Sequence, residues 1–180
     1  MGKEKNPFKL DVVSIRLVKD APICSKHPIT DPIHAVELVG KELCDMDREV
    51  VCVINLKADG TPINCSFVSV GVVNEAVAHP REILKTSILS NAANMIIVHN
   101  HPSGCLEPSK ADTAMTDRMV KICEFIGIPL LDHIIVGGDN SHYFSFKEKK
   151  LMPVPQIYLQ TDYRSLDIQT SMVAEKGRGR

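Results

Sequence analysis

The stretch MIIVHNHPSGCLEPSKAD, residues 95–112, contains the features that decide the fold. Its apolar start, residues 95–98, is typical of a buried strand. His99 and His101 follow at the end of that strand, and a proline-serine-glycine turn then leads to Ser109, a residue type that caps helices. The stretch therefore predicts a strand, a loop and a helix in direct succession.

Periodic patterns elsewhere in the chain predict further strands and helices. Helices are expected from Asp31 and Pro32, from Pro80, and from Ser109 to a stop at Gly127. The apolar positions that support the first helix are Ile33, Val36, Val39 and Leu43. Further strands are expected over residues 9–19, 49–56, 61–73, 129–136 and 142–146. Because strands and helices interleave, the pattern predicts an α/β fold in which a mixed sheet has helices on both faces.

The composition limits the functional classes that the chain can belong to. A length of 180 residues with 44% apolar content suits one domain, and a net charge of −1 provides no basic surface for nucleic acid. No apolar run approaches the ~18 residues of a membrane span, and no signal peptide is evident at the N-terminus. Six cysteines are scattered without a C-x-x-C motif, which argues against a disulfide framework. A cytoplasmic protein with no membrane association is expected.

The two histidines at the strand end predict a metal site. Residues i and i+2 of a strand point to the same face, so His99 and His101 should project together. Asp112 falls in the first turn of the next helix and adds a carboxylate. Two nitrogens and one oxygen form a ligand set suited to Zn²⁺, with a fourth position left for a water molecule. An open position is typical of catalytic zinc, because the ion then lowers the pKa of the bound water to about 7.

Structural explanations exist for each of these residues. Ser109 and Asp112 also form the S-x-x-D pattern of a capping box, and this role is compatible with metal binding. His99 taken alone is typical of a satisfied polar residue in the core. The remaining histidines have no comparable partners by spacing and are expected to be structural or exposed: His27, His34, His79, His133 and His142.

The spacing His99-x-His101-x7-Ser109-x2-Asp112 resembles the signature of the JAMM (JAB/MPN) metalloproteases. The hexapeptide at residues 99–104, HNHPSG, is similar to that of the RadC-like branch, and the likeness extends over roughly residues 46–148. The resemblance implies a three-layer α/β/α sandwich of the cytidine-deaminase-like kind, with Zn²⁺ held by the two histidines and the aspartate. It also implies that Ser109 helps to hold the tetrahedral intermediate.

Glu49 matches the upstream glutamate that the resemblance implies as the general acid and base. Glu82, in the first turn of the second helix, is the rival, although an acidic residue there is also favoured by the helix dipole. Cys105 stands where an aspartate or asparagine is commoner in this branch. Its thiol is either an additional metal ligand or a simple loop residue.

The chain is expected to divide into three parts. Residues 1–45 would form a strand and a helix that pack on the core, residues 46–148 the RadC-like metal-binding domain, and residues 149–180 a tail with little periodic structure. Residues 1–30 show no glycine-marked hairpin of the helix-hairpin-helix kind found in full-length RadC-like proteins, so a role directed at DNA has no support from that segment.

The expected function is hydrolysis of a peptide or isopeptide bond in a peptide or protein substrate that the sequence does not identify. Two alternatives stay open: a nucleic-acid-binding protein associated with DNA repair, and a non-catalytic interaction scaffold. A nucleobase deaminase would need H-x-E and P-C-x-x-C motifs, which are absent. The letters HNH do not make an HNH nuclease, whose named residues are dispersed over a ββα motif. Nothing in the sequence indicates the oligomeric state.

Overall fold

The computed structural model describes residues 14, 16–70, 79–138, 140–159 and 161. Its elements, in chain order, are α1 (Pro32–Cys44), β1 (Val50–Leu56), β2 (Pro62–Val70), α2 (Pro80–Leu89), β3 (Asn94–His101), α3 (Lys110–Ile126), β4 (Leu130–Gly137) and β5 (Tyr143–Ser145). Within the described part of the chain, no helix has the length and apolarity needed to cross a bilayer.

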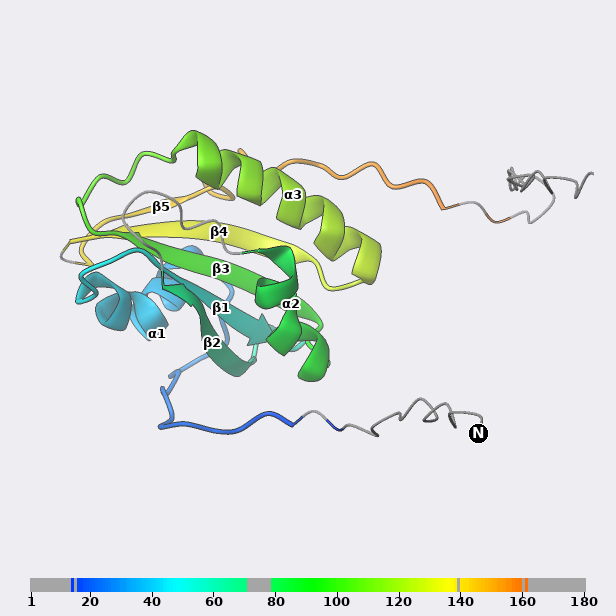
Figure 1. The fold of residues 1–180 in the computed structure, drawn as a ribbon, viewed down its shortest axis with the longest axis horizontal. Helices are drawn as coiled ribbons and strands as arrows, with labels where there is room; N and C mark the ends of the chain where they lie inside the picture. The colour runs from blue at the N-terminus through cyan, green and yellow to red at the C-terminus, as the bar shows by residue number, and fades with distance from the viewer. Residues whose placement is uncertain (1–13, 15, 71–78, 139, 160, 162–180) are drawn as a thin grey trace, which may run out of the picture.

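One five-stranded sheet organises the molecule, with strand order β2-β1-β3-β4-β5 (Figure 1). β3 and β4 run parallel and are joined through α3, as a parallel pair requires, whereas the other neighbours are antiparallel. The sheet is therefore mixed, as predicted, and the β3–loop–α3 succession lies at its centre.

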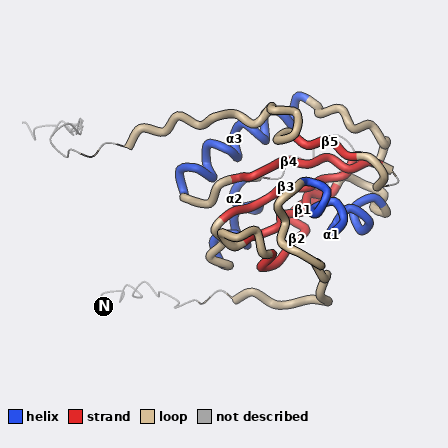
Figure 2. The backbone as a smooth tube through the Cα atoms, turned by 180° about the vertical axis from the view of Figure 1, so that it is seen from behind, coloured by secondary structure: helices blue, strands red, loops and turns tan. Residues whose placement is uncertain are grey.

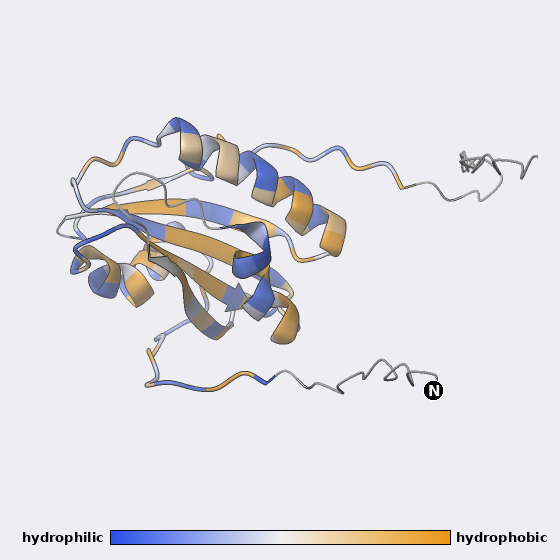
Figure 3. Ribbon diagram, in the orientation of Figure 1, coloured by the Kyte–Doolittle hydropathy of each residue, from blue (hydrophilic) through white to orange (hydrophobic). Residues whose placement is uncertain are grey.

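Helices cover both faces of this sheet. Alternate side chains of β1 point to opposite faces: Cys52 and Ile54 pack with α1, while Val51 and Val53 pack with α2 and α3. Figure 2, seen from behind, shows α1 on the face opposite to α2 and α3. The central strands are mainly hydrophobic, whereas the helices alternate between hydrophobic and hydrophilic residues (Figure 3). The prediction of an α/β fold with helices on both faces is confirmed.

The two predicted ends of α3 are present. The Ser109 side chain accepts a hydrogen bond from the Asp112 backbone, and the Asp112 side chain accepts one from the Ser109 backbone, which completes the capping box. Gly127 ends the helix in the left-handed region, at φ 72°, where glycine is favoured. The capping box positions Asp112 in the first helical turn, beside the end of β3.

The predicted start of α1 is confirmed, but one of its four predicted apolar positions is exposed. Asp31 occupies the N-cap position of α1, but its side chain makes no capping bond and instead accepts a hydrogen bond from the Thr30 hydroxyl at 3.0 Å. Ile33 is 41% exposed, whereas Val36, Val39 and Leu43 are buried as expected. A helix turns by about 100° per residue, which places Ile33 at the border of the buried stripe.

The strand predicted over residues 9–19 is wrong for its described residues. Residues 14 and 16–19 have no regular secondary structure, and Leu17 and Val18 are exposed; the others lie outside the described residues. Alternating residues alone do not make a strand, because a strand needs a partner for its backbone hydrogen bonds. The predicted C-terminal tail has no regular structure over residues 151–159, and most of its remainder lies outside the described residues. Residues 71–73, the end of the strand predicted over residues 61–73, also lie outside the described residues.

Candidate metal centre

The end of β3, the start of α3 and the entry to β1 meet at one point. His99 and His101 end β3, and Asp112 lies in the first turn of α3. The antiparallel register pairs Val51 with His99, so the residues just before β1 lie beside the end of β3. Glu49 is one of these residues. One ligand atom from each of these four side chains lies within 4.8 Å of those of the other three.

The closest atoms of the cluster are spaced like the ligands of one ion. His99 Nε2 lies 3.0 Å from His101 Nε2 and 3.2 Å from Asp112 Oδ1, and His101 Nε2 lies 3.5 Å from Asp112 Oδ2. Tetrahedral zinc with bonds of about 2.0–2.2 Å separates its ligand atoms by about 3.3–3.6 Å. The donor types of these three residues suit zinc, and the separations are close to this range, with one Asp112 oxygen near each histidine.

Asp112 is held as a buried carboxylate, and each of its two oxygens approaches one of the histidines. Its Oδ2 accepts hydrogen bonds from the Ser109 backbone N–H at 2.7 Å and from the Ser109 hydroxyl at 2.6 Å. Burial by itself raises the pKa of Asp112, but its contacts with His101 and His99 and the hydrogen bond from Ser109 outweigh burial and lower that pKa below its usual range. The capping box thus orients Asp112, so its structural role is compatible with metal binding.

His101 is oriented by the loop that follows it. Its Nδ1 lies 2.6 Å from the backbone oxygen of Cys105, and because a carbonyl only accepts, Nδ1 carries the proton. Nε2 of a neutral His101 then has a lone pair directed at the cluster. Cys105 contributes through its backbone: its side chain is exposed, and its thiol is not in the cluster of metal-binding groups found among the described residues.

A family model described as the RadC-like JAB domain matches residues 29–151, about two thirds of the chain. The chain belongs to the RadC-like JAB domain family. The matched region begins at Ile29 and therefore includes α1, so it starts earlier than the resemblance over residues 46–148. The two histidines, Ser109 and Asp112 all lie within the match.

Asn100, between the two histidines of the JAB domain, clamps the segment that carries Glu49. Its side chain is buried: Oδ1 accepts a hydrogen bond from the Val50 backbone N–H at 2.7 Å, and Nδ2 donates to the Arg48 backbone oxygen at 3.0 Å. The two bonds bracket Glu49 and fix its backbone beside the end of β3. Sequence reasoning missed this residue, since its partners are about 50 positions away.

His133 is the second residue that spacing failed to identify. It was expected to be structural or exposed without a relevant partner, but it is fully buried on β4 and its Nε2 lies 2.8 Å from His99 Nδ1. Its other nitrogen, Nδ1, lies 2.6 Å from the Thr116 hydroxyl of α3. The only signal in the sequence is a histidine inside an apolar strand, where burial demands hydrogen-bond partners.

The two candidate glutamates occupy different environments. Glu49 Oε1 lies 4.0 Å from His99 Nε2, and its side chain is 34% exposed, so it borders both the cluster and solvent. Glu82 is on the outside of α2, where its carboxylate pairs with Lys85 and lies 3.6 Å from Arg81. Glu82 is absent from the cluster of metal-binding groups found in the described residues. The geometry therefore places Glu49, and not Glu82, beside His99 and the rest of the cluster.

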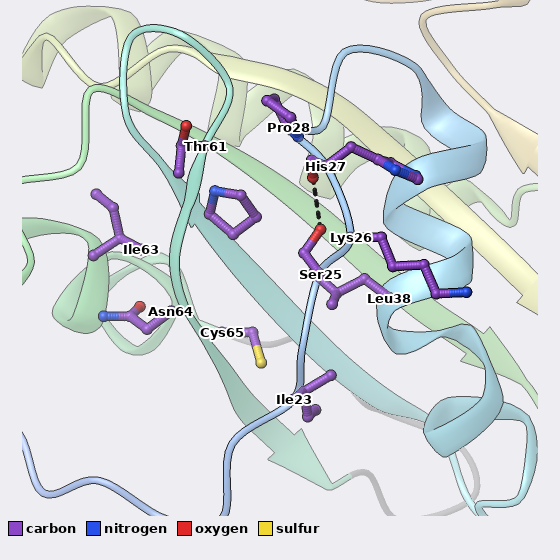
Figure 4. A pocket seen from close by; sticks show the side chains of 11 residues that line it. Ile23, Ser25, Lys26, His27, Pro28, Leu38, Thr61, Ile63, Asn64 and Cys65 are labelled. Atoms are coloured by element: carbon purple, nitrogen blue, oxygen red, sulfur yellow. Dashed lines mark hydrogen bonds between the residues drawn. The ribbon is translucent and has the colours of Figure 1, made fainter.

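A separate pocket of about 360 Å³ lies away from this cluster, between β2, α1 and the segment that precedes α1 (Figure 4). Cys65 of β2 borders it, and a hydrogen bond from the buried thiol of Cys52 lowers the pKa of Cys65 to about 7. None of the four residues of the metal cluster lines this pocket.

Proposed function

We propose that this JAB domain is a zinc-dependent hydrolase of the JAMM type that cleaves a peptide or isopeptide amide bond. The observation that supports it is the convergence of two imidazole nitrogens and one carboxylate at separations of 3.0–3.5 Å. Three protein ligands of these types, with one position left open, are typical of catalytic zinc sites. The proposal includes a cytidine-deaminase-like fold and a cytoplasmic location, where six free thiols would stay reduced.

Zn²⁺ held by His99, His101 and Asp112 would supply hydroxide near neutral pH and polarise the scissile carbonyl. Glu49 then acts as the proton shuttle: it takes a proton from the attacking water and returns it to the leaving amine. Its place at the border of the cluster suits this role, because its carboxylate reaches the ligand side chains and is also open to solvent. The Asn100 clamp keeps the Glu49 backbone in that place.

Ser109 would stabilise the oxyanion that develops during attack. In the structure its hydroxyl donates to Asp112 Oδ2 at 2.6 Å, so this role requires the hydroxyl to turn from Asp112 to the oxyanion. Asp112 Oδ2 keeps the hydrogen bond from the Ser109 backbone N–H when the hydroxyl turns. The carboxylate therefore stays oriented throughout.

Ser109→Ala should lower kcat by about 10²–10³, the usual cost of losing one oxyanion donor. The affinity for zinc should change little, because the backbone N–H at position 109 still orients Asp112. Steady-state kinetics and a zinc titration with a competing chelator measure the two quantities. Thr113→Ala is the matched control, since Thr113 carries an exposed hydroxyl in the same helical turn. Equal losses of kcat and zinc affinity would show that Ser109 acts only through Asp112.

The test of the proposed function is metal analysis of the purified chain together with a peptide-library cleavage screen. We expect about one zinc per chain, and cleavage that a chelator abolishes and added Zn²⁺ restores. A chain that holds no metal, or that cleaves equally well after chelation, contradicts the proposal. Bound zinc without cleavage of peptide or isopeptide substrates would favour the scaffold alternative. Salt-dependent binding to duplex DNA would favour the nucleic-acid alternative.

A further inference from the structure

We propose that Thr116 and His133 are positioning residues that set the tautomer of His99, so that His99 Nε2 presents a lone pair to the metal. This inference rests on the proposed function, since it assigns a metal to the cluster. It concerns two residues that are not ligands: Thr116 on α3 and His133 on β4 are both buried and lie behind His99.

Hydrogen bonds connect the Asp112 backbone oxygen, Thr116, His133 and His99 in series, and the direction of each bond follows from the carbonyl at the start of the series. The Thr116 hydroxyl lies 2.7 Å from the backbone oxygen of Asp112, which can only accept, so the hydroxyl proton is used there. The Thr116 oxygen must then accept the 2.6 Å hydrogen bond from His133, so His133 Nδ1 carries a proton. The hydrogen bond from Thr116 to the helix backbone thus fixes the proton of His133 on Nδ1.

The tautomer of His133 determines the tautomer of His99. With its proton on Nδ1, a neutral His133 has a lone pair on Nε2, and this nitrogen accepts the 2.8 Å hydrogen bond from His99 Nδ1–H. His99 Nε2 is then unprotonated and lies 3.2 Å from Asp112 Oδ1; in the absence of a metal its 3.0 Å contact with His101 Nε2 is a hydrogen bond that a His101 protonated on both nitrogens donates. Metal-binding histidines require a free lone pair of this kind, which the hydrogen bond at the other ring nitrogen sets.

Packing leaves the side chains of His99, Thr116 and His133 little freedom to rearrange. The ring of Phe146 stacks on His133, with centroids 5.1 Å apart and ring planes 3° apart. His99, Thr116 and His133 are at most 1% exposed, so water does not compete for their hydrogen bonds. This series of hydrogen bonds also joins α3 and β3, because it starts at the backbone of Asp112 in α3 and ends at His99 in β3. It therefore ties the orientation of one ligand to the position of the other.

Without the Thr116 hydroxyl, His133 and His99 should no longer be held in the tautomers that carry the proton on Nδ1. Without an acceptor at Nδ1, His133 gains by moving its proton to Nε2, where it donates to His99 Nδ1. His99 must then carry its own proton on Nε2, the nitrogen that faces the metal. The ligand would have to change tautomer before it could bind the ion.

The experiment compares Thr116→Val, which keeps the branched shape, with Thr116→Ser, which keeps the hydroxyl. Zinc affinity, measured by titration against a competing chelator, should fall about 10–100-fold in the valine variant. The serine variant should bind zinc as the unmodified chain does. Equal affinities of the valine variant and the unmodified chain would overturn the inference, and so would a serine variant as impaired as the valine variant.

A second measurement needs no metal and tests the inference separately from the proposed function. Nitrogen-15 NMR of the metal-free chain reports which ring nitrogen of each histidine is protonated. We expect His99 and His133 both to carry the proton on Nδ1, and to lose this preference in Thr116→Val but not in Thr116→Ser. His99 protonated on Nε2 in the unmodified chain would overturn the inference. A chain with the expected tautomers that binds no zinc would instead contradict the proposed function alone.

Discussion

Asp112→Ala should abolish stoichiometric zinc binding and, with it, chelator-sensitive hydrolysis. The variant removes the only carboxylate among the three closest groups and leaves two imidazoles at 3.0 Å. Losing a ligand should cost more than the ~10–100-fold in affinity that follows loss of a ligand's hydrogen-bond partner. Metal analysis after dialysis and a chelator-competition titration measure the change.

Asp117→Ala is the matched control for this loss of zinc. Asp117 lies on the same helix, but it is half exposed and pairs with Lys121 at 2.7 Å. It should keep a full equivalent of zinc. Asp112→Asn separates charge from capping, since an asparagine oxygen can still accept from the Ser109 backbone N–H. If Asp112→Ala retained a full equivalent of zinc, the assignment of the three ligands would be wrong.

Glu49→Gln should lower kcat by about 10²–10⁴ while zinc binding persists. The amide keeps the shape of the side chain but cannot take a proton from the attacking water. Zinc should persist because Glu49 Oε1 is 4.0 Å from His99 Nε2, farther than Asp112 is from either histidine. Kinetics on a peptide found by the library screen and metal analysis of the same preparation provide the two readouts.

Glu82→Gln is the control that distinguishes the two candidate glutamates. Glu82 is engaged with Lys85 and Arg81 on the outside of α2, so its replacement should leave kcat and zinc content unchanged. A loss of zinc in Glu49→Gln would instead make Glu49 a fourth ligand, which would leave no open position for catalysis. A normal kcat in that variant would show that the proton shuttle is another group.

The sequence predicted best those features in which neighbouring residues decide the outcome. The capping box spans four residues, and the left-handed end of α3 depends on Gly127 alone. The failed strand over residues 9–19 shows the limit of this approach, since its alternating pattern was real but its described residues have no strand partner. Ile33 shows the same limit on a smaller scale, because periodicity indicates the buried face of a helix better than its borders.

Within the candidate site, what the sequence determined by itself was the convergence of His99, His101 and Asp112. Backbone periodicity of two puts His99 and His101 on one face, and a short loop returns the chain to Asp112, so the spacing is enough to bring them together. Only the tertiary structure decided which glutamate lies beside them and which buried side chains hold them. Glu49 arrives through the register of β1 against β3, and His133 through the pairing of β4 with β3. Strand register depends on the packing of the whole core. The hydrogen-bonded partners that it brings together are 34–52 residues apart in the sequence, so local spacing does not reveal them.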